Sequence, residues 1–110
     1  SSEQCEKVLT LLHQVQESLQ QPELNADHVI CFDQYYGSGY GDPTPAMIEA
    51  VRLAASLEGL LLDPVYSGKA FAGLLDLVRH GYFDTSERIL FLHTGGAPGL
   101  FAYSECLSEH

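Results

Sequence analysis

Apolar positions in the first twenty residues repeat at the spacing of an α-helix. Valine or leucine occupies positions 8, 9, 11, 12, 15 and 19, and charged or amide side chains lie between them. This stripe at three- and four-residue intervals predicts an amphipathic helix over residues 2–20. We expect the helix to end before Pro22, because proline lacks a backbone N–H.

Two further helices are predicted by signals at both ends. Thr44-Pro45 matches an N-cap followed by proline at the first helical position, and apolar residues continue to Leu57 before Gly59 supplies a C-cap. A third helix is predicted over residues 68–80, with Gly81 ending it. A short final helix is expected over residues 97–103.

Three short apolar runs lie between these helices, at residues 28–32, 60–62 and 88–93. Their length and their leucine and β-branched content are typical of strands that are buried on both faces. The resulting order is α-β-α-β-α-β-α. Such alternation predicts a three-layer α/β/α fold in which a short parallel sheet is joined by right-handed crossovers.

Hydroxyl, aromatic and glycine residues follow each predicted strand. In a parallel sheet the segments after the strands meet at one edge, where open α/β folds bind ligands. Neutral hydroxyls and aromatic faces suit a planar heteroaromatic cofactor better than a phosphate or a metal ion. Two simpler interpretations stay open, an ordinary turn with Ser67 as N-cap and a plain Gly-Gly turn. The residues concerned are Tyr35, Tyr36, Tyr40, Tyr66, Ser67, His93, Thr94, Gly95 and Gly96.

Length and charge narrow the functional classes. The chain has 110 residues, enough for one modest domain, and a formal net charge of −10. This charge argues against a nucleic-acid or anionic-membrane partner. Three widely spaced cysteines match neither a disulfide framework nor a zinc site, so we expect a reducing, cytoplasmic environment and no metal. The sequence shows no membrane-spanning run, and it begins without methionine, as a piece of a longer protein would.

Three motifs resemble one enzyme family. They are Asp-Pro-Val-Tyr-Ser-Gly-Lys-Ala at 63–70, His-Thr-Gly-Gly-Ala-Pro-Gly-Leu-Phe-Ala-Tyr at 93–103 and Gly-Tyr-Gly-Asp-Pro-Thr at 39–44. Their order and separation resemble the carboxyl-terminal part of the D-cysteine desulfhydrase / 1-aminocyclopropane-1-carboxylate deaminase family. These enzymes use pyridoxal phosphate and have the tryptophan-synthase-β fold, known as fold type II. The resemblance implies that residues 1–110 form one α/β segment of such an enzyme.

The resemblance also implies roles for individual residues. Tyr40 and Tyr66 match two active-site tyrosines that approach the reacting end of the substrate and assist proton and leaving-group chemistry. Ser67 matches the residue that hydrogen-bonds the pyridine nitrogen of the cofactor. Thr94 matches a second residue beside that nitrogen, and Gly95-Gly96 keep the backbone close to the ring.

Two positions favour the desulfhydrase branch of the family. In the deaminases the position of Ser67 is glutamate and that of Thr94 is apolar, whereas both are hydroxyl residues here. A carboxylate would keep the ring nitrogen protonated, whereas a neutral serine leaves it closer to unprotonated and makes the ring a weaker electron sink. β-Elimination tolerates this when the leaving group on Cβ is a good one. We therefore expect a small amino acid such as D-cysteine, or a sulfonated analogue, to give an α-keto acid and ammonia.

The chain lacks part of the machinery that such an enzyme needs. Its two lysines are Lys7, on the polar face of the first helix, and Lys69, which matches a structural lysine of the family. The cofactor-binding lysine and the phosphate loop would belong to an amino-terminal portion of the same enzyme, and the full-length form is expected to be a homo-oligomer. The alternatives are a 1-aminocyclopropane-1-carboxylate deaminase, a non-catalytic small-molecule-binding module and a purely structural fragment.

Overall fold

The computed structural model describes residues 2–22 and 24–108, which divide into two compact units, Ser1–Asp33 and Gln34–His110. In the first unit, helix α1 spans Ser2–Leu19 and a single 3-10 turn, η1, spans Ala26–His28. The helix predicted from the apolar stripe is therefore confirmed to within one residue at its end. Much of that stripe is open to solvent, because Leu11 and Leu19 are 60% and 62% exposed.

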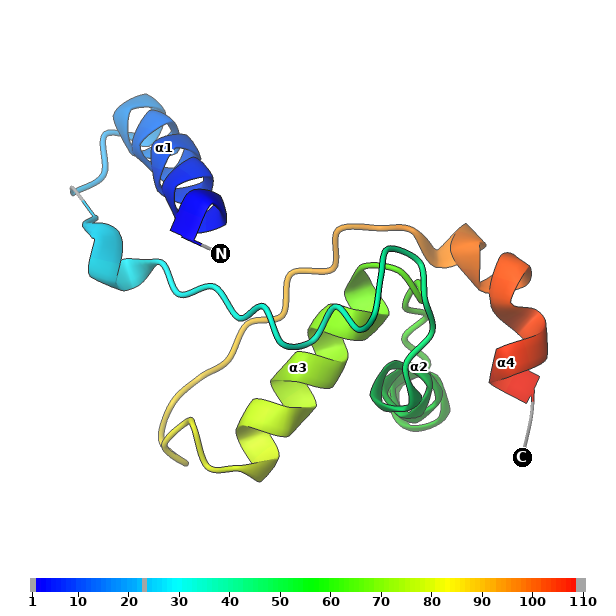
Figure 1. Ribbon diagram of the computed structural model, residues 1–110. Coiled ribbons are helices and arrows are strands. Elements are labelled where there is room, and N and C mark those ends of the chain that lie inside the picture. The colour runs from blue at the N-terminus through cyan, green and yellow to red at the C-terminus, as the bar shows by residue number, and fades with distance from the viewer. Residues whose placement is uncertain (1, 23, 109–110) are drawn as a thin grey trace. The chain divides into compact units, whose positions relative to one another are not determined.

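The second unit contains the other helices of the described chain (Figure 1). Helix α2 spans Pro45–Glu58, helix α3 spans Ser67–Arg79, the 3-10 helix η2 spans Ala97–Tyr103, and the short helix α4 spans Ser104–Ser108. The predicted caps of α2 are confirmed. The Met47 N–H donates to Thr44 Oγ1 at 3.1 Å, and Gly59 adopts the left-handed conformation with φ of 64°.

The core of this unit forms where α2 packs against α3 (Figure 1). Met47, Val51 and Leu62 are buried there, and Phe91 stacks edge-on against Phe71 with ring centroids 5.2 Å apart. Gly68 makes the close approach of the helices possible. A Cβ at this position would lie 2.6 Å from the Asp63 carbonyl oxygen and 2.8 Å from Val51 Cγ2. A side chain at position 68 would therefore clash with Val51 of α2 and with the backbone of Asp63.

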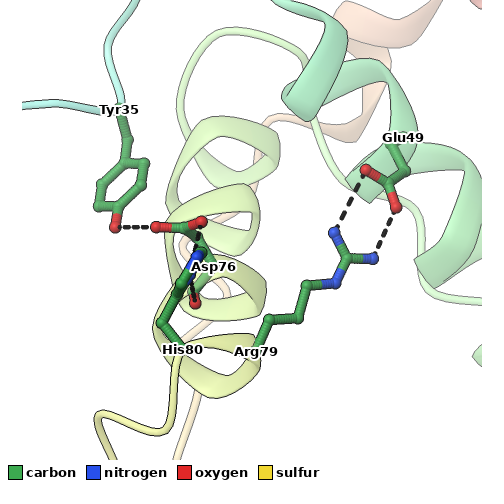
Figure 2. Close-up of polar contacts among 5 residues, drawn as sticks. All are labelled: Tyr35, Glu49, Asp76, Arg79 and His80. Atoms are coloured by element: carbon green, nitrogen blue, oxygen red, sulfur yellow. Dashed lines mark hydrogen bonds and ion pairs between the residues drawn. The ribbon is translucent and has the colours of Figure 1, made fainter.

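A surface ion pair also joins the two helices. Figure 2 shows the Arg79 guanidinium of α3 facing the Glu49 carboxylate of α2, with Nη2 and Oε1 2.6 Å apart. Both side chains are more than half exposed, and exposed ion pairs contribute little to stability. Burial of the apolar residues is accordingly the main force that holds α2 against α3.

The predicted α/β fold with a parallel sheet is wrong. Across residues 2–22 and 24–108 the structure contains helices and no strand. A strand needs a neighbour that pairs its N–H and C=O groups, and the described backbone hydrogen bonds outside the helices join residues that are close in sequence. The strands at 28–32, 60–62 and 88–93 were predicted from the length and the leucine and β-branched content of these runs, and such local features do not supply that neighbour.

The apolar residues of these runs have other environments. Leu62 is fully buried in the helical core, whereas Leu61 is 54% exposed. In the last run Phe91 packs on Phe71, and Leu90 and Leu92 are 91% and 76% exposed. Because the described part of the chain forms no sheet edge, the candidate residues must be assembled by the turn before α3 and the loops beside it.

Candidate functional site

The turn before α3 is built around the carboxylate of Asp63. Oδ2 accepts hydrogen bonds from the N–H groups of Val65 and Tyr66 at 2.9 and 2.8 Å, and Oδ1 accepts from the Ser67 N–H at 2.8 Å. Pro64 fixes the backbone torsion at the start of the turn, and an aspartate before such a turn satisfies its N–H groups. Asp63 therefore has a structural role in this turn.

These hydrogen bonds determine the ionisation of Asp63. The side chain is 3% exposed, and burial by itself raises the pKa of the carboxyl group. The hydrogen bonds from the Ser67 hydroxyl and from the N–H groups of Ser67, Tyr66 and Val65 act in the opposite direction and together outweigh burial. The net result is a pKa below the usual value of 3.8, so Asp63 is a stable carboxylate at neutral pH.

Ser67 is the first residue of α3 and is 4% exposed. Its Oγ donates to Asp63 Oδ1 at 2.6 Å and accepts from the Asp63 N–H at 2.8 Å. Tyr66, and not Ser67, occupies the N-cap position, so the alternative prediction of a serine N-cap is wrong by one residue. A hydroxyl group has one proton and two lone pairs, and these two bonds use the proton and one lone pair.

The hydroxyl groups of Tyr40 and Tyr66 lie 2.5 Å apart, and their rings meet edge-on with centroids 5.9 Å apart. Tyr40 comes from the loop before α2 and Tyr66 from the start of α3, so the structure brings together residues 26 positions apart. The two tyrosines are 81% and 60% exposed. The hydrogen bond with Tyr40, followed by desolvation, raises the pKa of Tyr66 above 10.0.

The glycine pair lies beside the same turn. Gly96 has φ of 93°, and a Cβ there would lie 3.0 Å from Cβ, Cγ and Oδ1 of Asp63. The Gly95 N–H donates to His93 Nδ1 at 3.0 Å, which leaves Nε2 of that ring to donate to the Leu61 carbonyl oxygen at 2.9 Å. His93 therefore ties this segment to the residues before α3, a structural role that the sequence left open.

The predicted site residues thus form two groups that meet at the start of α3. Tyr40 pairs with Tyr66, and Asp63 connects Ser67 to the Gly96 backbone. Thr94 is exposed and lies two residues before Gly96. The part of each residue in binding a cofactor or substrate stays a prediction.

Sequence reasoning missed the contact between Asp63 and Ser67 and the contacts of Lys69. The pairing of Asp63 with the Ser67 hydroxyl was not predicted, although an acidic residue four positions before a serine across a turn is a usable signal. The contacts of Lys69 with the Tyr40 loop were also missed, because the sequence has no local signal for a lysine that binds distant backbone carbonyls.

Comparison with known proteins identifies the family. Residues 1–95 match the family described as pyridoxal-phosphate dependent enzyme. The chain belongs to this family. Over 72 residues it is 60% identical to the D-cysteine desulfhydrases of Salmonella newport and Salmonella heidelberg, an alignment that covers 66% of this chain and 22% of each relative. The chain therefore spans about a fifth of the length of these relatives.

Membership of a pyridoxal-phosphate dependent family raises the question whether the residues present fit that cofactor. Hydroxyls, two aromatic rings and a glycine backbone surround the start of α3, and this set suits the flat ring of pyridoxal phosphate. The two lysines of the chain, which could bind the cofactor's aldehyde, both have other partners. The Lys69 amine donates to two backbone carbonyls, and the exposed Lys7 pairs with Glu3 at 2.7 Å in α1.

The described residues show neither a metal-binding cluster nor a membrane-spanning helix. Residues 2–22 and 24–108 contain no group of three or more histidine, cysteine or acidic side chains placed to hold a metal ion. Among the same residues, no helix is both long enough and apolar enough to cross a membrane.

Proposed function

We propose that this chain supplies the wall of a pyridoxal-phosphate site that faces the reacting end of the substrate, in a lyase of the D-cysteine desulfhydrase type. The enzyme would carry out β-elimination on a small amino acid such as D-cysteine or a sulfonated analogue. For D-cysteine the balanced reaction consumes water and gives pyruvate, ammonia and hydrogen sulfide. The 60% identity to D-cysteine desulfhydrases supports this proposal.

The observation that carries the proposal is the tyrosine pair. Tyr66 is a neutral phenol at neutral pH, and the hydrogen bond with Tyr40 raises its pKa further above 10.0. A neutral phenol that shares its proton with a second phenol is suited to protonate a departing thiolate sulfur and to recover the proton afterwards. Both rings are more than half exposed, so a substrate can reach them.

Ser67 is proposed to lie at the ring nitrogen of the cofactor, with Thr94 beside it and Gly95-Gly96 against the ring. The bound cofactor supplies the electron sink for the elimination. To donate a hydrogen bond to the ring nitrogen, the Ser67 hydroxyl would have to turn away from Asp63 Oδ1, which would keep the Ser67 N–H as a partner. A neutral hydroxyl at this position favours substrates with a good leaving group.

The remaining parts of the active site are assigned to other segments of the natural polypeptide. Both lysines of the chain are engaged, Lys69 with backbone carbonyls and Lys7 with Glu3. We therefore place the cofactor-binding lysine and the phosphate site in an amino-terminal portion. The homo-oligomeric state of the complete enzyme stays a prediction.

A single-turnover competition tests the substrate class. The natural polypeptide that carries this sequence is loaded with pyridoxal phosphate and offered D-cysteine together with 1-aminocyclopropane-1-carboxylate. We expect hydrogen sulfide and pyruvate from D-cysteine and no 2-oxobutanoate from the cyclopropane. Preferential opening of the cyclopropane ring would contradict the proposal, and L-cysteine serves as the control for the hand of the substrate.

A further inference from the structure

The amine of Lys69 lies inside the loop that carries Tyr40. Nζ donates to the carbonyl oxygen of Tyr36 and to that of Gly39, the latter at 3.2 Å, and a Cβ on Gly37 would lie 3.7 Å from it. The lysine is only 6% exposed, although lysine is among the residue types that are seldom buried. A buried amine surrounded by backbone carbonyls calls for an explanation other than solubility.

We propose that Lys69 is a positioning residue that holds the Tyr40 hydroxyl against that of Tyr66. The inference rests on the proposed function in one respect, because it assigns importance to the tyrosine pair on catalytic grounds. The contacts that support it are independent of any reaction.

Lys69 connects the backbone segments that carry the two tyrosines. Tyr40 directly follows Gly39, whose carbonyl oxygen accepts from Lys69. At the other end, Tyr66 precedes Lys69 by three residues in the first turn of α3, where the Ala70 N–H donates to the Tyr66 carbonyl oxygen at 2.9 Å. One short, buried connection therefore fixes the Tyr40 loop to the helix turn that presents Tyr66.

Two other contacts hold the ends of the same loop. The Tyr35 hydroxyl donates to Asp76 Oδ2 at 2.7 Å, and Figure 2 shows the ring lying beside α3 with its hydroxyl directed at that carboxylate. The Tyr103 hydroxyl donates to the Gly41 carbonyl oxygen at 2.7 Å. Lys69 holds the middle of the loop, between these anchors.

Lysine is chemically suited to this position. Its amine provides up to three N–H donors and its stem is flexible, so one side chain can reach two carbonyl oxygens that point in different directions. Methionine has a similar length and no donor. A Lys69→Met variant would therefore fill the same space and leave the Tyr36 and Gly39 carbonyls without this partner.

The test measures the tyrosine pair directly. The natural polypeptide is prepared with 3-fluorotyrosine at position 66, and its fluorine NMR shift is followed against pH. In Lys69→Met we expect the pKa of residue 66 to fall toward that of an isolated phenol, since Tyr40 moves away. We also expect kcat for D-cysteine to fall about 10- to 100-fold, with the visible absorbance of the cofactor unchanged. Lys7→Met, the other lysine of the chain, should match the wild type in all three measurements.

An unchanged titration of residue 66 in Lys69→Met would overturn the proposal. If that variant does not fold, Lys69→Gln replaces it. Its shorter amide reaches at most one of the two carbonyls, and a wild-type titration there would overturn the proposal equally. If the natural polypeptide does not act on D-cysteine but the titration responds to Lys69→Met, the proposed function fails while the positioning role of Lys69 stands.

Discussion

At the scale of single residues, Asp63 organises the candidate site more than any hydroxyl does. Its carboxylate accepts three backbone N–H groups and the Ser67 hydroxyl, and its side chain packs against Gly96. Removal of the charge would weaken four hydrogen bonds together. A carboxylate in this arrangement stabilises the turn only while it is ionised.

The first prediction concerns Asp63→Asn. Hydrogen bonds to a charged acceptor contribute about 1.5–3 kcal/mol, so we expect the free energy of unfolding at neutral pH to fall by roughly that amount. The folded-state pKa of Asp63 lies below 3.8. Its contribution is therefore fully present above that value and is lost as the pH falls through the lower, folded-state pKa. Urea unfolding at a series of acidic pH values should show a steeper loss of stability in the wild type than in the variant.

Asp84→Asn is the matched control for this prediction. Asp84 is an exposed aspartate whose pKa is also lowered by hydrogen bonds, in its case from the Ser86 hydroxyl and N–H. Since it is open to solvent, its substitution should leave stability near that of the wild type. Equal losses in the two variants would contradict the central place given to Asp63.

The second prediction concerns the tyrosine pair. In Tyr40→Phe the hydroxyl that pairs with Tyr66 is gone, so the pKa of Tyr66 should fall toward 10.0. The measurement is the ultraviolet absorbance of the phenolate during a pH titration, with the signal of Tyr66 identified by comparison with Tyr66→Phe. A titration curve of Tyr66 that does not respond to Tyr40→Phe would show that the two hydroxyls are not paired in solution.

Sequence reasoning at this scale found the residue types but not all of their connections. The motifs singled out Tyr40, Tyr66 and Ser67, and the structure pairs the two tyrosines. The motifs did not reveal that the Ser67 hydroxyl donates its proton to Asp63. They also did not reveal that Lys69 binds the loop that carries Tyr40. Such contacts depend on where a turn and a loop lie in space, which a motif does not encode.

At the scale of elements, the close packing of α2 on α3 determines where Ser67 and Tyr66 lie. Gly68 sits against the Asp63 carbonyl oxygen and Val51 Cγ2.

The third prediction is that Gly68→Ala lowers the free energy of unfolding by about 1–3 kcal/mol, the usual cost of overpacking. The exposed position Ala70 on the same helix provides the control, because Ala70→Ser should change stability by about 0.5 kcal/mol or less. Equal effects of the two substitutions in chemical denaturation would contradict this account of Gly68.

The helices could be predicted from the sequence, whereas the three predicted strands are not found among the described residues. Periodicity, the Thr44 cap and the Gly59 cap are local signals, and α2 begins and ends where they indicate. A strand depends on a partner that is distant in sequence, so the leucines at 60–62 carry no information on whether that partner is present. In the structure Leu62 instead completes a helical core.

At the scale of the whole molecule, all the candidate site residues belong to the unit Gln34–His110. Within this unit their arrangement rests on α2, α3 and the segments beside these helices. The chain spans 22% of the length of its D-cysteine desulfhydrase relatives. In our proposal the other groups of the active site therefore belong to further segments of the natural polypeptide.

The most direct test of the central claim is the turnover of D-cysteine by Tyr66→Phe in the natural polypeptide, recorded together with the cofactor absorbance. We predict that the wild type and the variant both show the band of lysine-bound pyridoxal phosphate at about 410–430 nm. Turnover in the variant should fall by about 100-fold or more, as expected on loss of a proton donor. Absence of the band from the wild type, or wild-type turnover in Tyr66→Phe, would contradict the account.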